Sequence, residues 1–253
     1  MLGFVTGASS GLGLALSRAL ARQGFSLVLT ARNEEKLRLE ASSFSPSAQI
    51  VRADLSNPQD RKSLVETIHQ TQPDLIINNA GFGLYGPAHT QPISDLHDMV
   101  EVNCQALMEL SVAGVEVLLK TGKKGTILNI SSAASFVPYP NFCVYAATKA
   151  FVTSFSQGLD SEVKEQGIRV LTICPGQIDT NFRDRASRHF PQEKNNITMS
   201  PEKAVKLILK AVQKGKSLSV IDWRYRLSVA LSKLLPRSVI EAVLRSHLKG
   251  RYR

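Results

Sequence analysis

The chain has 253 residues, of which 43% are hydrophobic, 21% charged and 6% aromatic, which excludes a disordered protein and a disulfide-stapled scaffold. Its three cysteines, Cys104, Cys143 and Cys174, share no metal-binding spacing, so we expect buried free thiols and no metal site. No stretch reaches the roughly 18 uninterrupted apolar residues of a membrane span, and no basic segment of a secretory signal precedes the first apolar run. We therefore expect a cytoplasmic protein.

The net charge of +10 comes entirely from the end of the chain. Residues 1–200 carry 18 basic and 18 acidic side chains, whereas residues 201–253 carry 13 and 3. This asymmetry is typical of a segment that meets an anionic membrane or an acidic protein, and equally of a solvated surface. We expect no nucleic-acid partner, because no recognition motif accompanies the charge.

Apolar runs rich in Val, Ile and Leu alternate along the chain with longer segments of helical period. Two of these helices have clear start signals, since Asn57 precedes Pro58 and Ser200 precedes Pro201. Strands that are apolar on both faces need helices on both sides of the sheet. We therefore predict an α/β, doubly wound fold with a parallel sheet of about seven strands. The expected strands are Leu2–Thr6, Ser26–Thr30, Gln49–Arg52, Asp74–Asn78, Gly125–Ile130, Arg169–Ile173 and Ser217–Ile221.

A glycine-rich loop joins the first expected strand to the first expected helix. It reads TGASSGLG, with glycines at positions 7, 11 and 13. Such glycines allow a tight turn, close approach of a pyrophosphate to the backbone, and close packing of the helix on the sheet. The strand before the loop and the helix after it favour a dinucleotide site over a purely structural turn.

Tyr145 and Lys149 are four residues apart in an expected helix, so both side chains project from one face. An ammonium beside a phenol favours the phenolate, so we expect the pKa of Tyr145 to fall from about 10 towards neutrality. Tyr145 is thus the candidate general acid for carbonyl reduction and general base for alcohol oxidation. Ser132, which follows the strand expected at Gly125–Ile130, can hold the substrate oxygen against it. Ser131 is the competing candidate.

The chain resembles the short-chain dehydrogenase/reductase family over residues 1–222. The resemblance rests on TGxxxGxG, NNAG at Asn78–Gly81, YxxxK at Tyr145–Lys149 and PGxIxT at Pro175–Thr180, with Asn103 in the family's asparagine motif. Ser132 precedes Tyr145 by the family's interval of 13 residues, which favours it over Ser131. The resemblance implies a Rossmann fold and hydride transfer between a nicotinamide and a carbonyl or alcohol carbon.

The same resemblance implies roles for the other residues of the motifs. Lys149 would also bind the nicotinamide ribose, and Asn103 would steady a water that relays protons to it. A satisfied amide that kinks a helix is the alternative for Asn103. The catalytic set is Asn103, Ser132, Tyr145 and Lys149, and a homodimer or homotetramer is expected through the helices that carry Asn103 and Tyr145.

The residues at the end of the second expected strand indicate which nicotinamide cofactor the protein binds. Ala31 stands where a carboxylate would bind the adenosine ribose hydroxyls, and Arg32 follows it, which favours NADP(H) over NAD(H). The alternative for Arg32 is a surface residue at a helix start. Asp54 matches an adenine-contacting position of the family, or is a polar turn residue. The predicted cofactor-binding residues are Gly7, Ser9, Ser10, Gly11, Leu12, Gly13, Arg32, Asp54, Leu55, Asn79, Ala80, Gly81, Tyr145, Lys149, Pro175, Gly176, Ile178 and Thr180.

Substrate choice is expected to depend on two other segments. Residues 181–199 form a basic loop that could accept an anionic substrate such as an acyl thioester, or could simply be solvated. Apolar residues near the reaction centre favour a lipid-like or acyl ketone. They are Phe82, Leu84, Tyr85, Phe136, Val137, Pro138, Tyr139 and Phe142.

Residues 223–253 form a predicted C-terminal extension of the domain that covers residues 1–222. We expect two basic amphipathic helices, at residues 223–235 and from Ser238, where Ser238 and Glu241 form a capping box. Their apolar faces could pack on the protein's own core, cover the active site, join subunits, or contact an anionic membrane peripherally. The sequence thus predicts an NADP(H)-dependent oxidoreductase. Alternatives are a general carbonyl reductase of small aldehydes and ketones, and a non-catalytic NADP(H)-sensing or scaffold protein.

Overall fold

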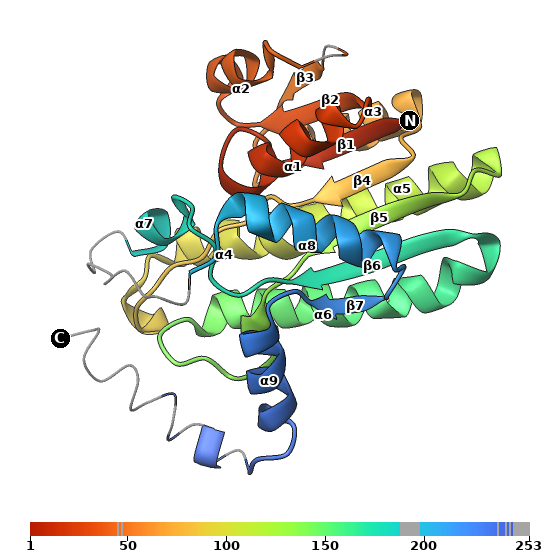
Figure 1. The fold of residues 1–253 in the computed structure, drawn as a ribbon. Helices are drawn as coiled ribbons and strands as arrows, with labels where there is room; N and C mark the ends of the chain where they lie inside the picture. Colours follow the sequence, from red (N-terminus) through yellow and green to blue (C-terminus); the bar gives the residue numbers. More distant parts are fainter. Residues whose placement is uncertain are drawn as a thin grey trace.

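The computed structural model describes residues 1–44, 46, 48–187, 198–236, 238–240, 242 and 244 (Figure 1). All its paired strands run parallel, in the order β3-β2-β1-β4-β5-β6-β7. The predicted doubly wound fold is confirmed, and each strand lies within one residue of its predicted bounds. The strands are β1 (Leu2–Thr6), β2 (Ser26–Ala31), β3 (Gln49–Arg52), β4 (Leu75–Asn78), β5 (Gly125–Ile130), β6 (Ile168–Cys174) and β7 (Leu218–Val220).

The helices begin where the sequence provides caps. The Asn57 side chain accepts a hydrogen bond from the Gln59 amide at 2.8 Å, and Ser200 accepts one from Lys203 at 3.3 Å. The α-helices are α1 (Gly11–Arg22), α2 (Glu34–Ala41), α3 (Pro58–Thr71), α4 (Ile93–Val100), α5 (Leu107–Thr121), α6 (Cys143–Val163), α7 (Phe182–Ser187), α8 (Pro201–Gln213) and α9 (Trp223–Ser232). Short turns of 3-10 helix lie at Ala88–Thr90, Ala133–Phe136 and Lys164–Gln166, and a π-helical turn at Glu101–Ala106.

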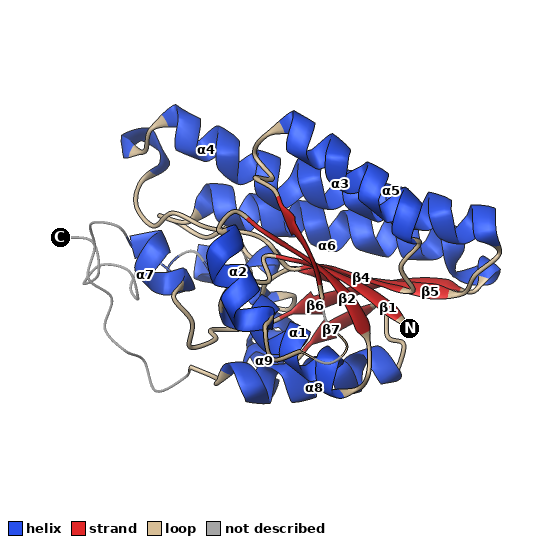
Figure 2. Cartoon of the chain, turned by 90° about the horizontal axis from the view of Figure 1, so that it is seen from above, coloured by secondary structure: helices blue, strands red, loops and turns tan. Residues whose placement is uncertain are grey.

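Helices cover both faces of the sheet, as Figure 2 shows. On one face α1, α2 and α8 enclose a core that includes Leu16 and Ile208. On the other face α3, α5 and α6 enclose a second core that includes Leu64 and Leu110. The strand order reverses between β1 and β4, so the loops after these strands diverge and leave a crevice at the carboxyl edge of the sheet.

One helical segment, Ile93–Thr121, is long and apolar enough to cross a membrane by length and composition, with a mean hydropathy of 1.4. Within this fold, 61% of that apolar window is buried. Leu110, Ala113 and Leu118 from this segment belong to the second core. The hydrophobicity of the segment is therefore that of a core helix.

The cysteines divide into two kinds. Cys104 and Cys174 are buried, as predicted, and all three are free thiols. Cys143 is exposed, so the expectation of a buried thiol is wrong there. It begins α6, where the side chain next to the buried Phe142 turns outward.

The C-terminal extension begins with α9, which leaves the edge of the sheet next to β7 (Figure 1). Asp222 caps this helix, because its carboxylate accepts hydrogen bonds from the Arg224 amide at 3.0 Å and from its guanidinium at 2.7 Å. The helix ends at Ser232 and is shorter than predicted. After it, residues 238–240, 242 and 244 are helical, whereas Glu241, Val243 and Leu248 of the predicted second helix lie outside the described residues.

Candidate active site

A cavity of about 1170 Å³ opens at the carboxyl edge of the sheet. It extends from Arg32, after β2, to Tyr145 on α6 and on to α9. Ser132 lines it, and so does every predicted cofactor-binding residue except Gly13. Segments that are distant in the sequence thus meet in one site of the size that a dinucleotide and a substrate need together.

The glycine loop forms the floor of this cavity. Gly7 and Gly11 have positive φ angles of 66° and 55°, which L side chains rarely adopt. A Cβ atom on Gly13 would lie 2.3 Å from the Gly7 carbonyl oxygen, so Gly13 lets α1 pack against the loop and does not line the cavity. The Asn79 amide donates to the Thr6 carbonyl at 3.0 Å and ties the loop to the end of β4.

The N-terminus of α1 faces the cavity through Ser10, Gly11 and Leu12. Ser10 is the N-cap, yet its side chain forms no capping hydrogen bond. Unpaired amides and the positive end of a helix dipole favour an anion at this position. The loop and helix start therefore fit the pyrophosphate of a dinucleotide.

At the predicted adenosine end of the cavity lie the basic side chain of Arg32 and the acidic side chain of Asp54. Arg32 is exposed, lines the cavity and forms no ion pair with another described residue. Asp54 also lines the cavity, but one of its carboxylate oxygens accepts from the Ser56 amide at 3.0 Å and the Ser56 hydroxyl at 2.8 Å. These contacts are those of a turn residue, so both interpretations of Asp54 stay open.

Tyr145 and Ser132 meet at the centre of the cavity. Tyr145 is 7% exposed, and its hydroxyl is hydrogen-bonded to the Ser132 side chain. Both hydroxyls can therefore reach one substrate oxygen. The Ser131 hydroxyl already has two hydrogen-bond partners, because it donates to the Lys149 carbonyl at 2.9 Å and contacts the Thr153 hydroxyl at 2.7 Å. The geometry favours Ser132 over Ser131.

Lys149 lies one turn after Tyr145 and is 3% exposed. Its ammonium donates to the Ile130 carbonyl at 2.9 Å and lies 5.7 Å from the centre of the Tyr145 ring. The amine therefore lies near the Tyr145 ring and has a hydrogen-bond partner at the end of β5.

The expected fall in the pKa of Tyr145 is wrong. Burial raises the pKa of Tyr145 to about 12, against the opposing hydrogen bond from Ser132. Burial also lowers the pKa of Lys149 to about 8. Because both side chains are buried, desolvation has a larger effect on the two pKa values than the attraction between ammonium and phenolate that the four-residue spacing suggested. At neutral pH Tyr145 is thus a protonated phenol, the form that can give a proton to a substrate oxygen.

Asn103 is fully buried in the π-helical turn. Its side-chain carbonyl accepts from the Phe82 amide at 3.0 Å, and its amide donates to the Phe82 carbonyl at 2.8 Å and the Thr148 hydroxyl at 3.0 Å. The alternative of a satisfied amide in a distorted helix describes these contacts. The Asn103 and Lys149 side chains both reach Gly81, where a Cβ would be 2.9 Å from Asn103 Oδ1 and 3.2 Å from Lys149 Nζ.

Aromatic rings form the wall around the reaction centre. Phe142 stacks on Tyr85 and on Tyr145, with both pairs of ring centres 4.2 Å apart. Phe82, Leu84, Val137 and Tyr139 also line the cavity, as predicted. Phe136 and Pro138 do not line it, and the ring of Phe136 instead lies 5.9 Å from the ammonium of Lys233.

The structure describes residues 181–187 and 198–199 of the basic loop. Within it, Arg183 and Arg185 on α7 line the cavity, and the Phe182 ring lies 5.5 Å from that of Tyr145. The Tyr85 amide donates to the Ala186 carbonyl at 2.9 Å and holds α7 to the aromatic wall. Asp184 of this loop also lies on α7, whereas Arg188, His189, Glu193 and Lys194 lie outside the described residues.

Sequence reasoning missed Tyr225 on α9. Its ring packs on Gly176, where a Cβ would approach it to 2.1 Å, and the Gln177 amide donates a hydrogen bond to its hydroxyl. Burial raises the pKa of this tyrosine. Tyr225 thus fixes the segment Pro175–Thr180, whose other end faces the glycine loop through Thr180, 3.1 Å from a Cβ on Gly11. It lies outside every motif, so no signal in the sequence marks it.

Comparisons with known proteins agree with this geometry. A family model described as short chain dehydrogenase matches residues 3–190. Sulfoacetaldehyde reductase 2 of Chromohalobacter salexigens is 34% identical over 183 residues, 70% of this chain and 73% of that protein. A short-chain dehydrogenase from Sphingobium yanoikuyae, solved with NADPH, has a TM-score of 0.82 at 28% identity and covers 87% of both chains.

A further solved structure is the bulky-bulky ketone specific alcohol dehydrogenase of Comamonas testosteroni. It has a TM-score of 0.78 at 27% identity, and the match covers 92% of each chain. The family match spans well over half of the present chain, including the glycine loop and the Tyr145–Lys149 pair. The chain belongs to the short-chain dehydrogenase family, and it is an oxidoreductase of alcohol and carbonyl groups.

Proposed function

We propose that the protein is an NADP(H)-dependent reductase of apolar, bulky or lipid-like ketones. One observation carries this proposal: a single cavity joins the glycine loop, the Ser132–Tyr145–Lys149 cluster and an aromatic wall. The first part suits a dinucleotide, the second a carbonyl oxygen and the third an apolar substituent.

Arg32 supports the choice of NADP(H). An arginine at the cavity edge can pair bidentately with a 2′-phosphate, whereas the buried Ala31 before it offers no carboxylate to the ribose hydroxyls. The structural relative from Sphingobium yanoikuyae was solved with NADPH, which supports the same choice. Residues of the glycine loop and Pro175–Thr180 would hold the pyrophosphate and the nicotinamide.

In the proposed reaction, a reduced nicotinamide, when bound, would supply a hydride for the carbonyl carbon. Ser132 and Tyr145 donate hydrogen bonds to the carbonyl oxygen and orient it. The Tyr145 hydroxyl would give its proton to that oxygen, so that a ketone with one added hydride and one added proton becomes a secondary alcohol. Lys149 would bind the nicotinamide ribose and resupply the proton. The role of Asn103 in a water relay to Lys149 stays a prediction.

The aromatic wall favours an apolar ketone, and the relative from Comamonas testosteroni, which acts on bulky ketones, supports this class. A second candidate is a small anionic aldehyde or ketone. Arg183 and Arg185 line the cavity, and the relative from Chromohalobacter salexigens reduces an aldehyde that carries a sulfonate. General reduction of small aldehydes and ketones is a third possibility for the same centre.

We also propose a homo-oligomer in the cytoplasm. Apolar side chains on the outside of α5 and α6 support a subunit contact there, as Met108 (36% exposed), Val112 (38%) and Phe151 (39%) are open to solvent. The subunit number, two or four, is to be measured by sedimentation.

The test is the rate of NADPH oxidation with three substrates: a bulky aromatic ketone, a short aliphatic ketone and sulfoacetaldehyde. We expect the highest kcat/KM for the bulky ketone, with NADH a poorer donor. A preference for sulfoacetaldehyde that is lost in Arg185→Ala would favour the anionic candidate. Tight NADPH binding without oxidation by any carbonyl would favour the sensor alternative.

A further inference from the structure

The two faces of α9 differ in what they contact. Tyr225, Val229 and Ser232, at intervals of four and three residues, line the cavity, and the Tyr225 ring packs on Gly176. The opposite side of α9 and of the turn after it carries Trp223, Leu227, Leu231 and Leu234, hereafter the α9 stripe, which are 71%, 54%, 47% and 81% exposed. The helix thus turns most of its large apolar side chains away from the core, against the usual arrangement.

This orientation is fixed from the inner side. The Tyr225 ring fills the space above Gly176, and Asp222 caps the helix and pairs with Arg224. Rotation of the helix to bury the stripe would break these contacts. The stripe also borders the cavity, because Leu231 lines it and is itself half exposed.

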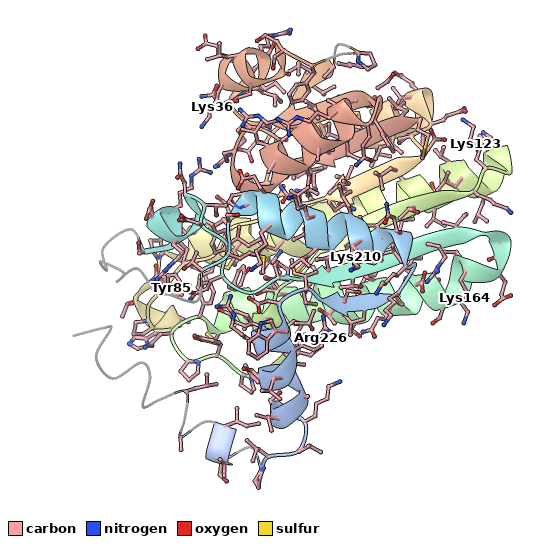
Figure 3. The ribbon with its side chains drawn as sticks, in the orientation of Figure 1. Lys36, Tyr85, Lys123, Lys164, Lys210 and Arg226 are labelled. Carbon is pink, nitrogen blue, oxygen red and sulfur yellow. The ribbon has the colours of Figure 1, made fainter. Side chains whose placement is uncertain are left out.

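The positive charge around the α9 stripe indicates which kind of partner surface could bind it. Residues 223–253 contain eight basic side chains and one acidic side chain, Glu241. Lys233 is exposed next to the stripe, and Arg226 on α9 is exposed too (Figure 3). A second copy of the chain seated on this face would bring two strongly basic segments together, and their repulsion would oppose the contact. An anionic surface would neutralise both.

We propose that the α9 stripe docks on an anionic membrane surface. The apolar side chains enter the interface between headgroups and acyl chains, and the surrounding Lys and Arg side chains bind lipid phosphates, as in other interfacial helices. Docking would bring the mouth of the cavity to the bilayer, where an apolar ketone concentrates. The docking itself does not depend on the proposed reaction.

The chain carries its own probe for this proposal. Trp223 is its single tryptophan and lies in the stripe. We expect its fluorescence to shift to shorter wavelength with vesicles of equal parts phosphatidylglycerol and phosphatidylcholine, and not with phosphatidylcholine alone. About 0.5 M salt, which shortens the Debye length to roughly 4 Å, should weaken the binding at least severalfold.

Matched variants separate docking from folding and from activity. The double variant Leu227→Gln/Leu234→Gln should lose the shift, because neither side chain lines the cavity and both are exposed. Leu39→Gln, at a leucine on α2 that is 75% exposed, should keep it. Circular dichroism checks that each variant is folded.

Three outcomes would overturn the proposal. The first is no shift with anionic vesicles at saturating lipid. The second is an equal shift with neutral vesicles, which would exclude the selection of anionic lipid. The third is a shift in buffer that grows with protein concentration and is accompanied by a larger sedimenting species, which would assign the stripe to a second copy. None of these depends on whether the protein reduces a ketone.

Discussion

The two ends of the cavity are built in different ways. At the glycine loop the backbone itself forms the site, and any side chain at Gly13 would strike the Gly7 carbonyl. At α9 the site is formed by side chains, with Tyr225 packed on Gly176 and the α9 stripe turned outward. Backbone sites require particular residues at particular intervals, whereas side-chain packing has many solutions. The glycine-loop end can therefore be predicted from a sequence, and the α9 end cannot.

The largest effect is expected at the reaction centre between the two ends. Tyr145→Phe removes the proton donor but keeps the ring that stacks on Phe142 at 4.2 Å. We expect kcat to fall by roughly 10² to 10⁴, the usual contribution of a general acid. NADPH affinity, measured by fluorescence titration, should stay within about twofold of the wild type. A variant that retains most of its kcat would assign the proton to another group.

The backbone end is tested by two substitutions of the same kind. Gly13→Ala places a methyl group 2.3 Å from a carbonyl oxygen, so we expect a loss of roughly 1–3 kcal/mol in unfolding free energy, together with weaker NADPH binding. Gly158→Ala in α6 meets no atom within 4 Å and should stabilise the protein by about 0.5–1 kcal/mol. Urea unfolding measures both. Equal stabilities for the two variants would contradict close packing at Gly13.

The adenosine end is tested at Arg32. Arg32→Ala should lower kcat/KM for NADPH by roughly 10- to 100-fold, equivalent to the 1.5–3 kcal/mol of a charged hydrogen bond, and leave the value for NADH nearly unchanged. Lys36→Ala is the control, because this lysine of α2 is exposed and does not line the cavity (Figure 3). An equal loss of kcat/KM with NADPH and with NADH would show that Arg32 does not recognise the 2′-phosphate.

The direction of the pKa shifts gives a pH prediction. Tyr145, with a pKa of about 12, keeps its proton throughout the neutral range, so its ionisation should not limit reduction below about pH 10. Oxidation of an alcohol needs the phenolate, so its rate should rise with pH. Lys149, with a pKa of about 8, loses its charge just above neutrality, and we expect a fall in the reduction rate there. An oxidation rate that is highest at acid pH would contradict this assignment.

A smaller effect is expected at the side-chain end. Tyr225→Phe keeps the ring over Gly176 but removes the hydroxyl that accepts from the Gln177 amide. One neutral hydrogen bond contributes roughly 0.5–1.5 kcal/mol, so KM for NADPH should rise about two- to tenfold. Leu227→Gln, on the outward face of α9, should leave KM unchanged. Identical KM values for NADPH in the wild type and in Tyr225→Phe would show that α9 does not contribute to the cofactor site.

These contrasts explain what the sequence could predict. The alternation of strands and helices predicted the fold, because burial on both faces of a parallel sheet leaves a clear pattern. The interval from Ser132 to Tyr145 singled out the serine that the structure places beside the phenol. The pKa of Tyr145 was predicted in the wrong direction, since spacing reports a neighbouring charge but not the burial of both groups.

The C-terminal extension was the least predictable part. Its apolar period predicted α9, yet amphipathicity could not tell which face meets the protein. Tyr225, rather than the leucines, decides that orientation, and Gly176 is the partner that makes room for it. The exposure of Cys143 escaped prediction for a similar reason, because composition reports a tendency to burial and not the direction of one side chain.

The central claim is that Ser132, Tyr145 and Lys149 complete hydride transfer from a cofactor held by the glycine loop. A single turnover with one equivalent of NADPH carrying deuterium at the transferred position, mixed with a bulky aromatic ketone, tests it directly. We predict that the wild type forms the alcohol with one deuterium on the former carbonyl carbon, and that Tyr145→Phe binds the cofactor without forming it. Product without deuterium, or equal product from both proteins, would contradict the claim.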